Sequence, residues 1–183
     1  MKNALLLHGT DGNSKTNWFP WLKKQLENKG WKVWLPDLPN SHFPNTKRYN
    51  EYILNNKEWK LNKDSIIIGH SSGSVSALGL LQNLPENICL NKVILISSFM
   101  NNLGWDNLDG LFEEPMNFEK IKKHAKEFIL IHSDNDPYCP LEHAEYLSKK
   151  LNGKLIIKKG EQHFGIEAGG KKYKEFPYLL EII

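Results

Sequence analysis

The sequence predicts an α/β fold in a single domain spanning residues 1–183, with a doubly wound sheet of about six parallel strands and helices on both faces. Short apolar runs recur along the chain, and segments with helical spacing of apolar residues separate them. This alternation favours parallel strands joined by crossover helices. A chain of 183 residues is long enough to bury one full core and needs no second domain.

The strands are expected where apolar character is nearly unbroken, as in parallel strands that are buried on both faces. The six runs are Ala4 to Leu7, Lys32 to Leu35, Ser65 to Ile68, Val93 to Ile96, Phe128 to Ile131 and Leu155 to Ile157. In such folds ligands bind beyond the carboxyl ends of the strands, near the point where strand order reverses. We therefore expect the functional loops to follow strands.

The helices are expected where apolar residues recur at three- and four-residue spacing. These segments are Trp18 to Asn28, Tyr49 to Asn55, Ser74 to Leu84, Phe118 to Ala125 and Leu141 to Leu151. Gly30, Pro85 and Pro140 stand at expected stop or start positions. The irregular stretch from Phe99 to Pro115 indicates either a binding loop or small lid, or an ordinary surface connection.

Composition argues against several function classes. The net charge is +3, but Arg48 is the only arginine and the lysines are dispersed, so no nucleic-acid partner is expected. No apolar run approaches the roughly 20 residues of a membrane span, and the N-terminus is interpreted as the first strand, so no membrane association is expected. Cys89 and Cys139 show neither C-x-x-C nor zinc-like spacing, which indicates no metal and a cytoplasmic location.

The most informative motif is Gly69-His70-Ser71-Ser72-Gly73, a G-x-S-x-G pattern between a buried-strand run and a helix start. A chain that leaves a strand and enters a helix almost at once holds the serine between them in a strained, exposed conformation. The small residues Gly69 and Gly73 permit that turn. The motif predicts Ser71 as a nucleophile.

A serine nucleophile needs a base, and the base needs an acid to orient it. Asp134 and Asp136 follow the fifth strand, and His163 follows the sixth in a glycine-flanked loop. This is the chain order serine, acid, histidine, with each member at the carboxyl end of a strand. We favour Asp136 because the following Pro137 stiffens its turn, although Asp134 remains an alternative. Ser71, Asp136 and His163 are the candidate catalytic residues.

An acyl-transfer site also needs two donors for the developing oxyanion. The amide of Ser72 at the helix start is one candidate, and the amide of Thr10 in the glycine loop after the first strand is the other. That loop lacks the G-x-G-x-x-G pattern of dinucleotide binding, and no organic cofactor is expected. Trp18, Trp105, Phe112 and Phe164 are candidates to line an acyl pocket, with core packing as the alternative for each.

The chain resembles the small α/β-hydrolase-fold serine hydrolases of the YdeN and retinoblastoma-binding-protein-nine type. The resemblance covers nearly the whole chain. It rests on Leu7-His8-Gly9 with Trp18 and Trp21, Pro36-Asp37-Leu38-Pro39, Gly69 to Gly73, Asp136 to Pro140, and Gly160 to Phe164. It implies a compact hydrolase without a large cap domain and with Ser71, Asp136 and His163 as triad. No L-x-C-x-E surrounds either cysteine, so binding to pocket proteins is not carried over.

Together these features predict a serine hydrolase that cleaves a small ester or related acyl compound through an acyl-enzyme. The expected partner is a small-molecule acyl substrate, and the oligomeric state is left open. Two alternatives remain at this point: an amidase or peptidase using the same triad, and a catalytically weak binding module that keeps only the scaffold.

Overall fold

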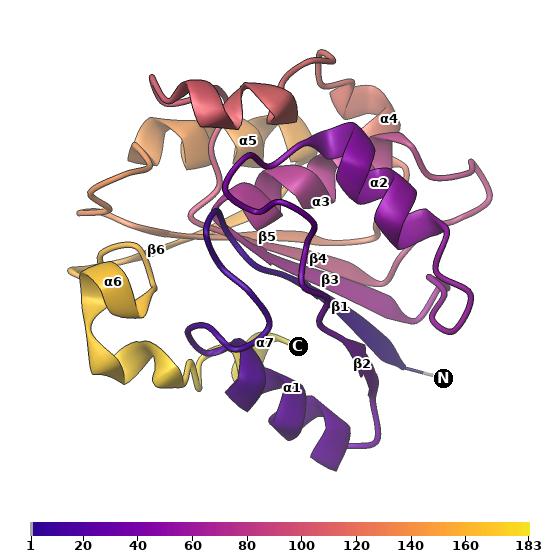
Figure 1. The fold of residues 1–183 in the computed structure, drawn as a ribbon, viewed down its shortest axis with the longest axis horizontal. Coiled ribbons are helices and arrows are strands. Elements are labelled where there is room, and N and C mark those ends of the chain that lie inside the picture. The colour runs from indigo at the N-terminus through magenta and orange to yellow at the C-terminus, as the bar shows by residue number, and fades with distance from the viewer. Residues whose placement is uncertain (1) are drawn as a thin grey trace.

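The computed structural model describes residues 2–183 and contains one sheet of six parallel strands in the order β2-β1-β3-β4-β5-β6 (Figure 1). The strands are β1 (Asn3–Leu7), β2 (Lys32–Trp34), β3 (Ser65–His70), β4 (Lys92–Ile96), β5 (Phe128–Ser133) and β6 (Lys154–Lys158). Each expected strand is present, so the predicted fold class is confirmed.

Two central strands run two residues further than the sequence predicted. Gly69 and His70 of β3 continue the ladder with β4, and His132 and Ser133 of β5 continue the ladder with β6. The strand β3 therefore ends at His70, immediately before Ser71, with no intervening loop.

Helices cover both faces of the sheet (Figure 1). The five predicted helices are α1 (Phe19–Asn28), α2 (Thr46–Leu54), α3 (Ser72–Gln82), α4 (Phe118–Lys122) and α5 (Leu141–Leu151). The helices α2, α3, α4 and α5 lie on one face and α1 lies on the other. Within residues 2–183 no helix combines the length and apolar character needed to cross a bilayer.

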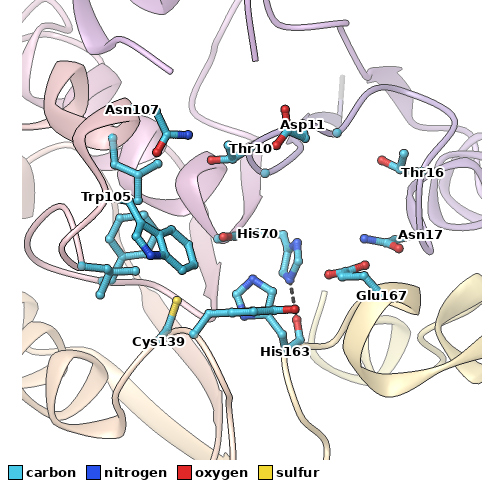
Figure 2. A pocket seen from close by; sticks show the side chains of 17 residues that line it. Thr10, Asp11, Thr16, Asn17, His70, Trp105, Asn107, Cys139, His163 and Glu167 are labelled. Carbon is cyan, nitrogen blue, oxygen red and sulfur yellow. Dashed lines mark hydrogen bonds between the residues drawn. The ribbon is translucent and has the colours of Figure 1, made fainter. Parts of the chain in front are cut away.

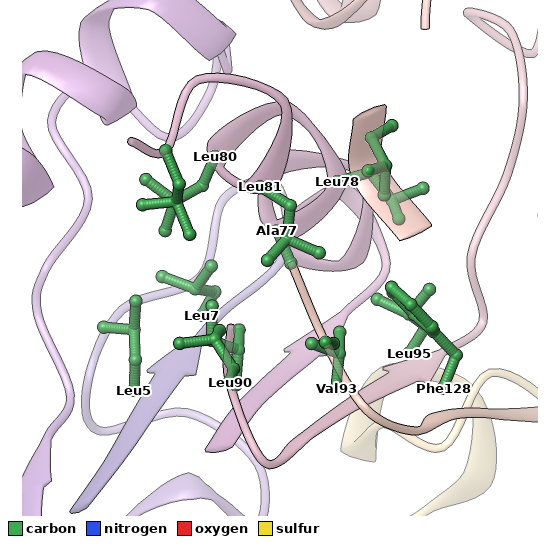
Figure 3. Packing of buried hydrophobic residues seen from close by; sticks show 14 of the residues in the cluster. Leu5, Leu7, Ala77, Leu78, Leu80, Leu81, Leu90, Val93, Leu95 and Phe128 are labelled. Atoms are coloured by element: carbon green, nitrogen blue, oxygen red, sulfur yellow. The ribbon is translucent and has the colours of Figure 1, made fainter. Parts of the chain in front are cut away.

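The strands divide the core into two layers because successive side chains point to opposite faces. Leu5 and Leu7 of β1 pack in the layer beneath α2, α3 and α5, whereas Ala4 and Leu6 pack in the layer that contains α1. Figure 3 shows residues of α3 above apolar residues of the central strands. The nearly unbroken apolar runs follow from this two-sided burial.

The edge strand β6 departs from that pattern. Its residues are only partly buried, and Ile157 is 46% exposed. The sequence-based expectation of strands buried on both faces is therefore wrong for β6. An edge strand has a neighbour on one side only, so apolar composition does not guarantee its burial.

Several short elements have no counterpart in the sequence-based prediction. They are the 3-10 helices η1 (Asp106–Leu111) and η2 (Lys171–Lys174) and the helices α6 (Ile166–Gly169) and α7 (Leu179–Ile182). Within the irregular stretch, Leu108 and Leu111 of η1 are buried against Val75 of α3. The C-terminal segment buries Phe176 and Leu179 in the same layer as α1. Both segments are therefore anchored on the core.

The reversal of strand order falls at β1, which lies between β2 and β3. From β1 the chain goes to β2 on one side, and it then continues through β3 to β6 on the other. Loops that leave neighbouring strands in opposite directions open a crevice at the carboxyl edge of the sheet. The loop after β1 and the turn after β3 border this crevice.

Candidate active site

Ser71 has an unusual backbone conformation between β3 and α3. Its φ of 56° and ψ of −127° lie in a region that residues with a side chain rarely occupy. The strain is of the kind that concentrates at functional sites. It points the Ser71 side chain into the cavity described below.

Gly69 and Gly73 make this turn possible because backbone groups occupy the space beside them. A Cβ on Gly73 would lie 2.2 Å from the carbonyl oxygen of Leu7, and one on Gly69 would lie 2.5 Å from that of Gly73. A Cβ on Gly9 would come within 3.0 Å of the Cβ of Ser71. The glycine loop after β1 therefore lies directly against Ser71.

A buried histidine fixes this glycine loop. His8 accepts a hydrogen bond at Nε2 from the amide of Leu38, at 2.9 Å, and its Nδ1 lies 2.9 Å from the carbonyl oxygen of Gly9. The Nδ1 nitrogen therefore carries the ring proton and donates a hydrogen bond to the carbonyl oxygen of Gly9. Burial lowers the pKa of His8, so the ring stays neutral and keeps both contacts. His8 thereby joins Leu7-His8-Gly9 to the segment Pro36 to Pro39.

His163 and Asp136 are hydrogen-bonded. The Nδ1 of His163 lies 2.9 Å from Oδ2 and 3.0 Å from Oδ1 of Asp136, and both side chains are buried. Burial alone would raise the pKa of Asp136. The hydrogen bonds from His163, Ser97 and the Cys139 amide outweigh that effect, so the pKa is lowered to about 2. Asp136 is therefore a carboxylate at neutral pH.

The alternative acid, Asp134, has another role. Its Oδ1 accepts a hydrogen bond from the amide of Gly160 at 2.8 Å, and it thereby holds the loop that carries His163. The structure thus brings Asp136 to the histidine and leaves Asp134 as a residue that joins two loops.

Ser97 is a contact of Asp136 that the sequence analysis missed. Its hydroxyl donates to Oδ2 at 2.6 Å, while the amides of Tyr138 and Cys139 donate to Oδ1 at 3.0 Å. Ser97 directly follows β4 and has a φ of 49°. The available signal was its position, because it too stands at the carboxyl end of a strand.

Ser71 and His163 line the same cavity, which has a volume of about 470 Å³ (Figure 2). Their side chains are not hydrogen-bonded to each other within residues 2–183. Contacts between nucleophile and base are often long without substrate and shorten in its complex. The carboxyl edge of the sheet thus brings the three candidate catalytic residues to one place.

His70, within the G-x-S-x-G motif, contacts a residue that is distant in sequence. Its Nε2 donates to the backbone carbonyl of His163 at 2.6 Å, and the two rings lie 4.8 Å apart (Figure 2). Complete burial, and next the proximity of His163, lower the pKa of His70 to about 3. His70 is therefore neutral at physiological pH.

The two candidate oxyanion donors lie beside each other. The hydroxyl of Thr10 donates to the hydroxyl of Ser72 at 3.0 Å, which joins the glycine loop to the start of α3. In the part of the chain that the structure describes, neither the Thr10 amide nor the Ser72 amide has a hydrogen-bond acceptor. Both amides are therefore available to a ligand atom.

The candidate pocket residues divide into two groups. Trp105 lines the cavity, whereas Trp18, Phe112 and Phe164 do not, so the expectation is corrected for these three. Trp18 and Phe164 are fully buried, and the indole of Trp18 donates to the carbonyl of Phe164 at 3.0 Å. Phe112 packs behind Phe99, with ring centroids 6.0 Å apart. All three consolidate the surrounding core.

Other cavity residues had no distinctive signal in the sequence. On the apolar side these are Phe99, Leu103, Leu108 and Tyr138, and on the polar side they are Asp11, Thr16, Asn17, Asn107 and Glu167. Single residues in loops carry no periodicity, so the pattern of the chain does not reveal their orientation.

A metal is a chemical alternative for the same side chains. Asp136, Cys139 and His163 each offer a ligand atom, and these atoms lie within 4.8 Å of one another. Both oxygens of Asp136, however, already accept hydrogen bonds from Ser97 and two amides, and burial raises the pKa of the Cys139 thiol. The arrangement is therefore typical of a hydrogen-bonded carboxylate and histidine.

Comparison with known proteins shows which family the chain matches. The family model described as Serine hydrolase matches residues 4–181. YdeN of Bacillus subtilis (strain 168) is 25% identical over 183 residues, covering 100% of this chain and 94% of that protein. Serine hydrolase RBBP9 of Rattus norvegicus is 28% identical over 186 residues, covering 98% and 92%. The crystal structure of the ydeN gene product from B. subtilis superposes with a TM-score of 0.91 at 24% identity, covering 100% of this chain and 96% of that one.

Proposed function

The chain belongs to the serine hydrolase family, and from that premise we propose that Ser71, His163 and Asp136 act as a catalytic triad that hydrolyses a small ester. The observation that carries this proposal is that His163, which is paired with the buried Asp136, lines the same cavity as the strained Ser71. A carboxylate hydrogen-bonded to one ring nitrogen leaves the other free to act as a base.

The proposed reaction begins with attack of Ser71 Oγ on the substrate carbonyl carbon. His163 takes the hydroxyl proton at Nε2, because its Nδ1 is hydrogen-bonded to Asp136. Asp136 stabilises the imidazolium that forms. His163 then donates the proton to the leaving group, and water releases the acid from Ser71 in a second cycle of the same kind. The reaction needs no organic cofactor.

The oxyanion of the tetrahedral intermediate is proposed to bind the amides of Thr10 and Ser72. Both belong to segments that border Ser71, and the Ser72 amide lies at the N-terminus of α3. Loss of one such donor typically costs about 2.7 to 4 kcal/mol of transition-state stabilisation. The acyl chain would contact Trp105 and the other apolar residues of the cavity.

Fluorophosphonate labelling and hydrolysis of p-nitrophenyl acetate and butyrate test the proposal. We expect Ser71→Ala to abolish labelling and to lower kcat by at least about 10³-fold. His163→Ala should cost nearly as much, because members of a triad act as a unit. Ser148→Ala, on α5, is the control and should behave as wild type. Unchanged labelling of the Ser71 variant would remove that residue from the mechanism.

We also propose that the protein works in a reducing compartment such as the cytoplasm. Support comes from Cys89 and Cys139, which are both free thiols. Cell fractionation with the tagged chain tests this, and recovery in an oxidising compartment would contradict it.

A further inference from the structure

The charge of the cavity is opposite to that of the chain. The chain has a net charge of +3, yet the cavity is lined by the acidic residues Asp11 and Glu167 and by no lysine or arginine within residues 2–183. A site that carries one sign of charge attracts ligands of the other sign.

Glu167 is the carboxylate that has no partner. Asp11 is paired with His42, whose Nδ1 lies 2.7 Å from Oδ1 of the aspartate. Glu167 is exposed to the cavity and has neither a hydrogen bond nor an ion pair in the described part of the chain, residues 2–183. It is therefore free to interact with a ligand.

Two contacts describe the surroundings of Glu167. The amide of Ile166, at the start of α6, donates to the side chain of Asn17 at 2.9 Å. The carboxylate lies against the backbone of Gly165, where an added Cβ would come within 2.0 Å of Oε1. In the sequence, Glu167 stands four residues after His163. Figure 2 shows it beside Asn17, on the side of the cavity opposite Trp105.

This arrangement gives the leaving group and the acyl chain of an ester different places in the cavity. His163 protonates the leaving group in the proposed function, on which this inference rests, so the leaving group must lie on the side of His163. Glu167 and Trp105 both line the cavity and stand on opposite sides of it (Figure 2). We infer that Glu167 selects esters of a short apolar acid with an alcohol that carries an amino or ammonium group.

The selected reaction is ordinary ester hydrolysis. Attack by Ser71 breaks the bond between the carbonyl carbon and the oxygen of the amino alcohol, and that oxygen takes the proton that His163 removed from Ser71. Water then releases the acid. The positive charge of the alcohol takes no part in bond making, so Glu167 acts in substrate selection.

Two esters of one acid test the inference. Butyrylcholine carries a quaternary ammonium, and 3,3-dimethylbutyl butyrate replaces that nitrogen with carbon. At low salt we expect wild type to show a kcat/KM about two- to fivefold higher for the cationic ester, as for one exposed ion pair. Glu167→Gln should bring the ratio close to one, and 0.5 M NaCl should reduce it in wild type.

Glu86→Gln is the matched control. Glu86 is an exposed glutamate that follows α3, at the opposite edge of the sheet from the cavity, and its variant should keep the wild-type ratio. A wild-type ratio near one would overturn the inference, as would a preference for the cationic ester that survives in Glu167→Gln. In both cases Ser71-dependent hydrolysis of p-nitrophenyl butyrate would leave the proposed function standing. Absence of that hydrolysis would refute the function itself.

Discussion

The ring of His70 donates a hydrogen bond to the backbone carbonyl of His163 at 2.6 Å. The residue that precedes the candidate nucleophile thereby holds the main chain of the candidate base, which lies 93 positions later in the sequence. Trp18 packs edge-on against His70, with ring centroids 6.0 Å apart, so the donor is itself fixed in the core. His70 is thus a positioning residue for the site.

His70→Ala should lower kcat by about 10- to 100-fold with little change in KM, because the His163 carbonyl loses a buried donor and the ring loses its support. His70→Gln retains an N–H group and should recover part of that loss. Steady-state kinetics with p-nitrophenyl butyrate measures both variants. Equal kcat values for wild type and His70→Ala would show that the hydrogen bond has no positioning role.

Acid stability should depend on His70. Its pKa is lowered to about 3 in the folded protein, whereas an unfolded histidine has a pKa near 6.5, so the unfolded state binds more protons between these values. Stability therefore falls as pH drops below about 6.5. Between pH 7 and 5 the loss from this group is about 2 kcal/mol. Urea unfolding at pH 7 and 5 should show a smaller loss in His70→Gln than in wild type.

Ser97→Ala removes a donor from Asp136. The pKa of Asp136 should rise from its lowered value, and kcat/KM should fall about tenfold because the carboxylate orients His163 less firmly. Ser98→Ala is a close control, since the neighbouring hydroxyl is buried without a hydrogen-bond partner in residues 2–183. Ester hydrolysis measures both. A larger loss of activity in Ser98→Ala than in Ser97→Ala would contradict this role.

The sequence predicted the strands and the loops that carry Asp136 and His163 because both depend on regular patterns. Buried parallel strands require continuous apolar runs, and the carboxyl edge of a sheet gathers loops that are distant in sequence. Asp136 and His163 could therefore be paired before their contact was seen.

Side-chain orientation in loops could not be predicted in the same way. Trp18 at a helix start and Trp105 in an irregular stretch look equivalent in sequence, yet one is fully buried and the other is 47% exposed. Four-residue elements such as α6, which carries Glu167, are too short to show a periodic pattern. Ser97 likewise has no neighbouring motif.

Gly73→Ala should disrupt the turn that carries Ser71. The added Cβ would lie 2.2 Å from the backbone oxygen of Leu7, so strand β1 or helix α3 must shift. We expect a loss of at least about 2 kcal/mol in stability and of most activity. Gly160→Ala is the control, because that glycine has a φ of 72° but open space around it. It should lose only about 1 kcal/mol. Urea unfolding compares the two.

Trp105→Ala should change acyl-chain preference. Trp105 is partly exposed in the cavity wall and lies edge-on to Tyr138, with ring centroids 6.0 Å apart, so its loss removes apolar contact area without opening the core. We expect kcat/KM for p-nitrophenyl butyrate to fall about tenfold, and that for the acetate to change less, because the shorter chain has less surface to bury.

Trp18→Ala distinguishes the cavity wall from the core. Trp18 is fully buried and hydrogen-bonded to the Phe164 carbonyl, so its loss should cost about 3 to 5 kcal/mol of stability. The butyrate-to-acetate ratio of the folded fraction should stay near the wild-type value, since Trp18 does not line the cavity. If Trp18→Ala altered that ratio while Trp105→Ala left it unchanged, the acyl chain would have to bind on the side of Trp18, and the apolar wall formed by Trp105 would have no role in substrate selection.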